Sequence, residues 1–273
     1  MATDDAGIAA GWDRSAAAYD DVLDANRRGA ERLVAALPDA PYREVVDVGC
    51  GTGFASWAMA RRAGARRLTG VDVAPAMVER YLERLGGLPG VAVDAVVAPA
   101  DAMPLPAASA DAVVSAMALH WMPDRAGAVA AMARLLRPGG TLGVLCSGAG
   151  ADGEYRDLIA GLDPPVPAEL VDAYARMQAA EGELEDHARA AGLEPVDAWT
   201  ERRRRRMPPE RFLARKRATE SALIAHLPEE EREAMWRRIA AAVHAAAEPG
   251  GFAFTFVKAY VVARAPGPAP PGA

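Results

Sequence analysis

The chain has 273 residues, of which 51% are hydrophobic and 25% are charged, and its formal net charge is −6. This composition is ordinary for a globular protein, and the length fits one domain with an attached cap better than two independent domains. The acidic balance provides no general attraction to nucleic acid or to an anionic membrane, so we expect neither as a partner.

The first half of the chain alternates helices and strands. A helical segment is expected over 5–37, closed by the prolines at 38 and 41. Strands are expected at 44–50, 67–72, 91–98, 111–117 and 141–147, and helices at 54–63, 75–85 and 125–136. This alternation predicts a doubly wound α/β fold, with a parallel sheet, right-handed crossovers and helices on both faces.

The second half of the chain is less regular. We expect one or two helices within 153–180, a helix at 182–191, a strand at 193–206, helices within 208–247 and a last strand at 252–262. The proline-rich tail 265–273 is expected to be disordered. The first residues are acidic and no apolar run would cross a bilayer, so we expect a cytoplasmic protein without a signal peptide.

A glycine-rich turn, DVGCGTG (47–53), lies where the first strand meets its helix. Glycines let the backbone adopt positive φ and approach a ligand, and the crevice beyond the strand ends is where such sheets bind ligands. The dinucleotide-binding fingerprint G-x-G-x-x-G/A requires a small residue at the position where this chain has Phe54. Asp47 would repel a pyrophosphate but suits a cationic ammonium group. The pattern therefore argues against a dinucleotide.

Two further carboxylates follow at the ends of the next strands. Asp72 closes the second strand, where a carboxylate accepts hydrogen bonds from both ribose hydroxyls of an adenosine. Asp101 follows the third strand, in position to accept from an adenine amino group. Other interpretations stay open: Asp47 as a capping or ion-paired residue, Asp72 as the start of a turn before Pro75, and Asp101 as an ordinary loop carboxylate.

Five motifs occur in the order found in a known family. They are DVGCGTG (47–53), GVDVAPAM (70–77), PADAMPLP (99–106), ADAVVSAMALHWMPD (110–124) and ARLLRPGGTL (133–142). Together they resemble class I S-adenosylmethionine-dependent methyltransferases of the type 11, UbiE-like and malonyl-carrier-protein types, over residues 12–148. The resemblance implies a Rossmann-like, doubly wound seven-stranded sheet with a reversed last strand and a helical substrate cap. It also implies S-adenosyl-L-methionine as cofactor and S-adenosylhomocysteine as product.

The resemblance also assigns individual residues and regions. The implied contacts are Tyr19, Asp47, Gly49, Cys50 and Gly51 for the methionine portion, Asp72 and Val73 for the ribose, Met77, Asp101 and Ala102 for adenine, and Ala116 and His120 at the sulfonium end. The implied regions are an N-terminal helical lid (1–40), a cofactor-binding core (41–150), a segment that completes the sheet and carries the cap helices (151–264), and the tail (265–273).

His120 is the candidate catalytic residue. It follows the fourth strand, and a histidine there would act as a general base. The alternative, slightly favoured, is a partly buried side chain that packs against the cofactor and Trp121. No cluster of His, Asp or Glu has recognisable metal spacing, so no metal is expected. Cys50 and Cys146 lie in apolar strand-like runs without a CxxC partner, so no disulfide is expected.

Five consecutive arginines occupy 202–206, and four more basic residues lie at 211 and 215–217. A solvated strand and helix edge is the first interpretation because the whole chain is acidic. A docking surface for an acidic carrier protein is the second, and an RNA-binding stripe is the third.

The expected activity is methyl transfer to a small metabolite, which we expect to be hydrophobic because an apolar cap built from such helices favours an apolar acceptor. O-methylation is the expected outcome. One alternative is methyl esterification of a malonyl group on a carrier protein. Another is a protein that binds the cofactor without transferring its methyl group. A monomer or homodimer is expected.

Overall fold

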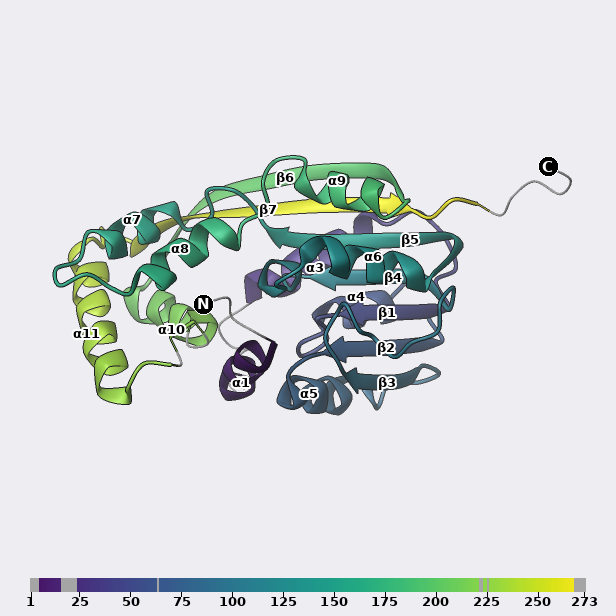
Figure 1. The fold of residues 1–273 in the computed structure, drawn as a ribbon, viewed down its shortest axis with the longest axis horizontal. Coiled ribbons are helices and arrows are strands. Elements are labelled where there is room, and N and C mark those ends of the chain that lie inside the picture. The colour runs from purple at the N-terminus through teal and green to yellow at the C-terminus, as the bar shows by residue number, and fades with distance from the viewer. Residues whose placement is uncertain (1–4, 16–23, 63, 221–222, 225, 268–273) are drawn as a thin grey trace, which may run out of the picture.

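The computed structural model describes residues 5–15, 24–62, 64–220, 223–224 and 226–267. Seven strands form one sheet in the order β3-β2-β1-β4-β5-β7-β6 (Figure 1). They are β1 (Glu44–Val48), β2 (Arg67–Asp72), β3 (Ala92–Val97), β4 (Ala110–Ala116), β5 (Leu136–Ser147), β6 (Glu194–Met207) and β7 (Phe252–Arg264). Strands β1 to β5 pair in parallel, and β7 is antiparallel to both of its neighbours. The predicted doubly wound sheet with a reversed last strand is confirmed.

The helices lie between the strands, as the alternation predicted. They are α1 (Asp5–Ser15), α3 (Asp24–Ala36), α4 (Phe54–Ala60), α5 (Pro75–Leu85), the 3-10 turn η2 (Leu119–Trp121), α6 (Arg125–Leu135), α7 (Gly153–Ala160), α8 (Ala168–Arg176), α9 (Glu183–Ala190), α10 (Pro209–Glu220) and α11 (Glu229–Ala245). The segment predicted as helical over 5–37 contains α1 and α3, and residues 16–23 between them lie outside the described residues. None of the described helices is long and apolar enough to cross a bilayer.

Among the strand boundaries, the start of β5 differs most from the sequence prediction. Residues 137–140 were expected to end a helix in a turn, but they belong to β5, which begins at Leu136. The register between β4 and β5 shifts at this point, because Ala110 pairs with Leu136 whereas Ala112 pairs with Thr141. The irregularity therefore places the extra residues of the Pro-Gly-Gly segment in β5.

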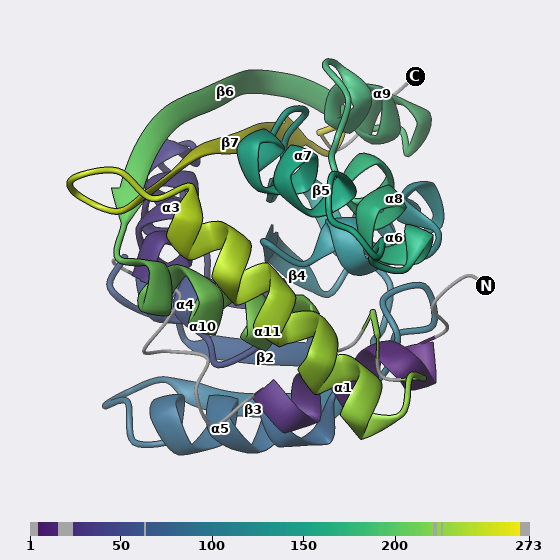
Figure 2. The same cartoon turned by 90° about the vertical axis from the view of Figure 1, so that its left-hand side faces the viewer.

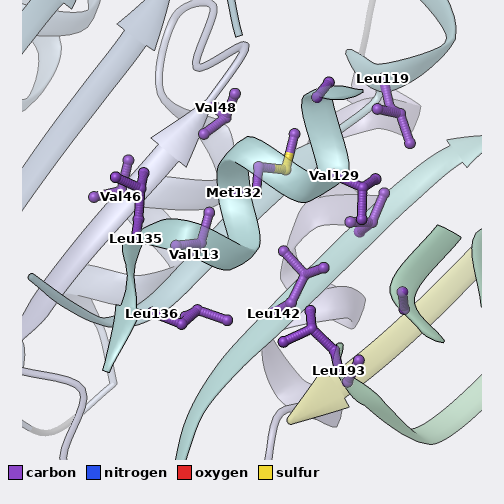
Figure 3. Packing of buried hydrophobic residues seen from close by; sticks show 14 of the residues in the cluster. Val46, Val48, Val113, Leu119, Val129, Met132, Leu135, Leu136, Leu142 and Leu193 are labelled. Carbon is purple, nitrogen blue, oxygen red and sulfur yellow. The ribbon is translucent and has the colours of Figure 1, made fainter. Parts of the chain in front are cut away.

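Two apolar layers enclose the sheet. On one face, Val46, Val113 and Leu142 pack with residues of α6 and α9 (Figure 3). On the other face, Val45 and Val114 pack with residues of α3 and α4. Each fully buried aliphatic side chain contributes about 1.5–3 kcal/mol. Both faces of the central strands are therefore buried, which explains their nearly continuous apolar sequences.

Strands β6 and β7 continue beyond the rest of the sheet. Their pairing runs from Glu194–Arg264 to Met207–Phe252, whereas β5 pairs with β7 only as far as Ser147–Lys258. Helices α7, α8, α10 and α11 gather on this extension, and Figure 2 shows α10 and α11 crossing in front of the sheet. Their own apolar cluster includes Tyr155, Leu170, Phe212, Trp236, Ile239, Phe252 and Phe254. We refer to these four helices and the strand extension as the cap.

Candidate active site

A cavity, here called the strand-end cavity, lies beyond the carboxyl ends of β1, β2 and β4. Residues of α1 and α3 complete its wall. Of the residues that the resemblance assigned to the cofactor, the cavity is lined by Asp47, Gly49, Cys50, Gly51, Asp72, Val73, Met77 and Ala116. This position is the one expected for a ligand in a doubly wound sheet.

The glycine turn gives the cavity its shape. Gly49 has a φ of 66°, and a Cβ atom there would lie 2.2 Å from the Cβ of Ala118. Gly51 has a φ of 50°, but a Cβ there would meet nothing within 4 Å. Gly49 is thus required by conformation and by space, whereas Gly51 leaves room for a ligand to approach the backbone.

Asp72 is held in place by two backbone donors. The N–H of Gly51 donates to Oδ2 at 2.8 Å, and the N–H of Ala74 donates to Oδ1 at 3.0 Å. Burial raises the pKa of this carboxyl, and the backbone donors counteract part of that rise. The bond to Ala74 is the local turn anticipated before Pro75. Because each carboxylate oxygen has a second lone pair, the same side chain remains able to accept from two adjacent hydroxyls.

Asp47 is 1% exposed, and its Oδ2 accepts from both the N–H (3.0 Å) and the hydroxyl (2.8 Å) of Ser56. Burial raises the pKa of Asp47 to about 7, although the Ser56 donors lower it. A buried carboxylate of this kind gains stability from a cation, which lowers the pKa again. The chemistry of the turn therefore fits a ligand with an ammonium group and a ribose.

Helix α1 covers this cavity. Trp12 packs on Ala74 and Met77, and Asp13 accepts at 2.9 Å from the N–H of Ala76 in the first turn of α5. Ile8 of the same helix is 5% exposed and lines the cavity. Trp12 and Ile8 were not among the predicted contacts, although Trp12 opens the N-terminal part of the resemblance.

Four predicted cofactor contacts are not among the residues lining this cavity: Tyr19, Asp101, Ala102 and His120, the last of which is described below. Asp101 and Ala102 are exposed, and the wall after β3 is formed by residues 98–100 instead. Their contact with adenine stays a prediction. Tyr19 lies outside the described residues.

A second cavity, the cap cavity, lies between the sheet and the cap. Its wall includes His120 and Ser147 from the sheet side, and Tyr174, Arg215 and Lys216 from the cap. The two cavities share four lining residues: Trp12, Asn26, Met117 and Trp121. They therefore meet at the end of β4.

Met117 marks this junction. It has a φ of 59°, which is uncommon for a residue with a Cβ, and its N–H donates to the carbonyl of Leu145 at 2.7 Å. Such backbone strain is concentrated at functional sites in proteins.

Comparison with known proteins identifies the family. The family model of the methyltransferase domain matches residues 46–144. Trans-aconitate 2-methyltransferase of Methylobacterium nodulans is 33% identical over 193 residues, which cover 70% of this chain and 67% of that protein. The chain belongs to the S-adenosylmethionine-dependent methyltransferases. The family prediction and its cofactor, S-adenosylmethionine, are confirmed.

The names of other relatives specify different methyl acceptors. The 27-O-demethylrifamycin SV methyltransferase of Amycolatopsis mediterranei is 34% identical over 68% of this chain and 66% of that protein. The chain spans about half the length of the malonyl-[acyl-carrier protein] O-methyltransferases of Hahella chejuensis and Serratia marcescens, at 33% and 32% identity over 54% and 50% of this chain. A solved structure from Bacillus halodurans shares the fold, with 18% identity, a TM-score of 0.61, and coverage of 88% of this chain and 99% of that one.

In this methyltransferase, His120 faces the cap cavity and does not line the strand-end cavity. It is about nine-tenths buried, and its Nδ1 has no hydrogen-bond partner among the described residues. Burial lowers the pKa of His120 to about 3, and the charge of Arg125 lowers it further. The imidazole is therefore neutral at neutral pH and is a weak base. Its catalytic role stays a prediction.

The cap wall contains a buried ion cluster that sequence reasoning missed. Arg215 donates to both oxygens of Asp152 at 2.9 Å, and Lys216 donates to Asp152 at 2.8 Å. Lys216 also lies 3.3 Å from Glu220, which accepts from the hydroxyls of Tyr155 and Tyr174. Burial alone would raise the pKa of Asp152, but the two cations outweigh it and the pKa is lowered. No local motif connects these residues, because they come from α7, α8 and α10.

Proposed function

We propose that this methyltransferase transfers the methyl group to an oxygen atom of a small-molecule acceptor bound in the cap cavity. The observation that carries the proposal is the junction at Met117 and Trp121, which line both the strand-end cavity and the cap cavity. A methyl group in one cavity and an acceptor in the other would meet there. Holding two reactants in this way supplies on the order of 7–11 kcal/mol of barrier reduction.

The strand-end cavity suits the cofactor, which supplies a methyl group already activated on a sulfonium. We assign Asp47 to the ammonium group and Asp72 to the ribose hydroxyls, because both carboxylates are pre-oriented by hydrogen bonds. The glycine turn would take the methionine portion, and Ala98 to Ala100 with Met77 would provide an apolar wall for the adenine. Helix α1 would exclude water from the bound cofactor.

The cap cavity suits an acceptor with an apolar part. Trp12, Trp121 and Phe256 line it together with Met177 and Leu223. The relatives' names specify a small acid, a rifamycin and a carrier-bound malonyl group, each acceptor being different. These names support a metabolite-sized acceptor and O-methylation, with the cap selecting among acceptors.

We assign His120 the orientation of an acceptor hydroxyl. A neutral imidazole donates through one nitrogen and accepts through the other, and His120 lines the cap cavity while its buried Nδ1 has no partner among the described residues. With its pKa lowered to about 3, His120 would be a poor acceptor of a full proton. A carboxylate acceptor would need no base.

A carrier-bound malonyl group is the second candidate acceptor. The observation in its favour is a groove lined by arginines that shares residues with the cap cavity. The match to malonyl-carrier-protein methyltransferases covers about half of each relative.

The test separates cofactor binding from turnover. Calorimetry with S-adenosylmethionine, S-adenosylhomocysteine, NADH and ATP should give heat for the first two only. Incubation with methyl-labelled cofactor and a set of hydroxy and carboxy acids, followed by mass spectrometry, should then give S-adenosylhomocysteine and a methylated product in equal amounts. Binding of NADH or ATP without the sulfonium compound would overturn the proposal, and so would cofactor binding without product from any acceptor class.

A further inference from the structure

The arginine run is divided between the two faces of the β6–β7 extension. Arg203 pairs with Phe256 and Arg205 with Phe254, so their side chains share one face with the aromatic residues of β7. Arg202 and Arg204 lie on the opposite face. There Arg202 donates to the carbonyl of Ala149 at 3.1 Å, and Arg204 lies 4.0 Å from Glu154.

The face of Arg203 and Arg205 forms one wall of a groove that we call the basic groove. Its basic residues are Arg28, Arg32, Arg203, Arg205, Arg206, Arg211, Arg215 and Lys258, and its acidic residues are Glu31 and Glu201. Arg32 forms an ion pair with Glu201. By contrast, Arg203, Arg205 and Arg211 have no carboxylate partner within the part of the chain that is described. Cations gathered in this way without counter-charges attract an anion.

The basic groove adjoins the cap cavity, and we call the boundary between them the passage. The two share Asn26, Arg215, Phe256 and Lys258. Arg215 is 6% exposed. Its Nη2 donates to Asp152, whereas its buried Nε has no hydrogen-bond partner in the described structure. Lys258 is 7% exposed, and its amine lies against Gly29 of α3, where an added Cβ would approach it to 2.5 Å. The passage is therefore bordered by two buried cations.

We propose that the acceptor carries an oxyanion group, a phosphate or a carboxylate, at a position other than the methylated atom, and that Arg215 and Lys258 bind this group at the passage while Arg203 and Arg205 extend the site into the groove. The inference rests on the proposed function. The acceptor's methylated atom would lie at Met117 and Trp121, and its anionic group where the cap cavity borders the basic groove.

Charge and geometry favour an oxyanion over other ligands. The cap cavity is lined by three cations, Arg215, Lys216 and Lys258, and by two carboxylates, Asp152 and Glu220. Arg215 has a donor to spare, and the guanidinium fork matches the oxygens of carboxylate and phosphate. Attraction between buried charges is also stronger than in water.

Calorimetry on the full chain saturated with S-adenosylhomocysteine tests this site. The probes are pyrophosphate and citrate, which distinguish a phosphate from a carboxylate preference. The Arg203→Gln/Arg205→Gln variant should lose about tenfold or more in affinity for at least one probe. The matched Arg202→Gln/Arg204→Gln variant, on the opposite face, should bind as the parent protein does. Affinity should also fall as salt is added.

Three results would overturn the inference: no binding of either probe by the parent protein, equal losses in both double variants, or binding of an acidic carrier protein in the absence of any binding of the free anions. The last result would assign the groove to protein docking. Because S-adenosylhomocysteine binding is measured first in the same samples, failure of the cofactor assignment would be recognised separately.

Discussion

Trp12 of α1 meets Trp121 at the end of β4 edge to face, with ring centroids 5.0 Å apart and an angle of 84° between the ring planes. One ring comes from α1 and the other from η2. Each of the two residues lines the strand-end cavity as well as the cap cavity. This contact connects the N-terminal helix to the point where cofactor and acceptor would meet.

Replacement of Trp12 by alanine is therefore expected to weaken cofactor binding and to admit water to the junction. Loss of an aromatic pair costs about 0.5–1.5 kcal/mol, or roughly 2- to 12-fold in affinity. Calorimetry with S-adenosylmethionine measures the effect. Trp57→Ala is the control, because that side chain is 37% exposed on α4 and does not line either cavity. Equal effects of both variants would remove α1 from the site.

Asp72→Asn should reduce cofactor affinity by about 10- to 100-fold, because it replaces a charged acceptor of ribose hydroxyls with a neutral amide. The amide oxygen still accepts one of the two backbone bonds from Gly51 and Ala74, so the fold should persist. Thermal unfolding checks that point. Asp157→Asn, at an exposed carboxylate of α7, provides the control. Unchanged affinity in the Asp72 variant would exclude the ribose assignment.

The pKa of Asp47 predicts a pH dependence. Its pKa is raised from 3.8 to about 7, so between these two pH values the folded protein without ligand holds a proton that the unfolded chain has lost. The contribution of Asp47 to the free energy of unfolding therefore decreases as the pH rises from 3.8 to about 7. A cationic ligand favours the carboxylate, so binding near pH 6 should release this proton. Calorimetry in two buffers of different ionisation enthalpy measures the release. Asp47→Asn should abolish it, and an unchanged release in that variant would contradict the ammonium assignment.

The pKa of His120 gives the stability of the protein the opposite dependence on pH. Its pKa is lowered from 6.5 to about 3, so the unfolded chain takes up a proton in this interval and stability falls as pH decreases through it. Turnover should show no titration near 6.5 from this residue. If His120 orients the acceptor, His120→Asn should retain most of kcat and His120→Ala should lose about 10-fold or more. A kcat profile with a break near 6.5 that both variants remove would instead identify a general base.

The buried ion cluster should be sensitive to loss of a single cation. Lys216→Met leaves Asp152 and Glu220 partly uncompensated, and breaking a buried pair costs about 3–5 kcal/mol. Urea unfolding measures this loss in the free energy of unfolding. The neighbouring Arg217→Met removes an exposed pair with Glu233 and should cost at most about 1 kcal/mol. Similar losses in the two variants would show that the cluster contributes no more than a surface pair.

Much of the fold was predictable because its signals are local. The glycine turn, the apolar strands and the helices between them follow from the backbone freedom of glycine and from side-chain periodicity. The prediction was less accurate at residues 137–140, because the register shift between β4 and β5 depends on pairing across the sheet, which a local Pro-Gly-Gly signal does not reveal. Eight predicted cofactor residues line one cavity because seven occupy strand ends or the turns after them and Met77 lies in the first turn of α5. Asp101 and Ala102 lie only one and two residues beyond that wall, and spacing does not reveal which residues of a loop turn inward.

The cofactor was predictable from the sequence alone, because the residues that we assign to its ammonium group and ribose lie in the short segments 47–53 and 70–77. Only the tertiary structure decided where the acceptor would bind. Asp152, Arg215, Lys216 and Lys258 come together because the long β6–β7 pair carries the cap over the strand ends, and contacts between residues so distant in the chain leave no periodic signal. The arginine run appeared uniform in the sequence, and the pairing of β6 with β7 separated it into two faces with different surroundings.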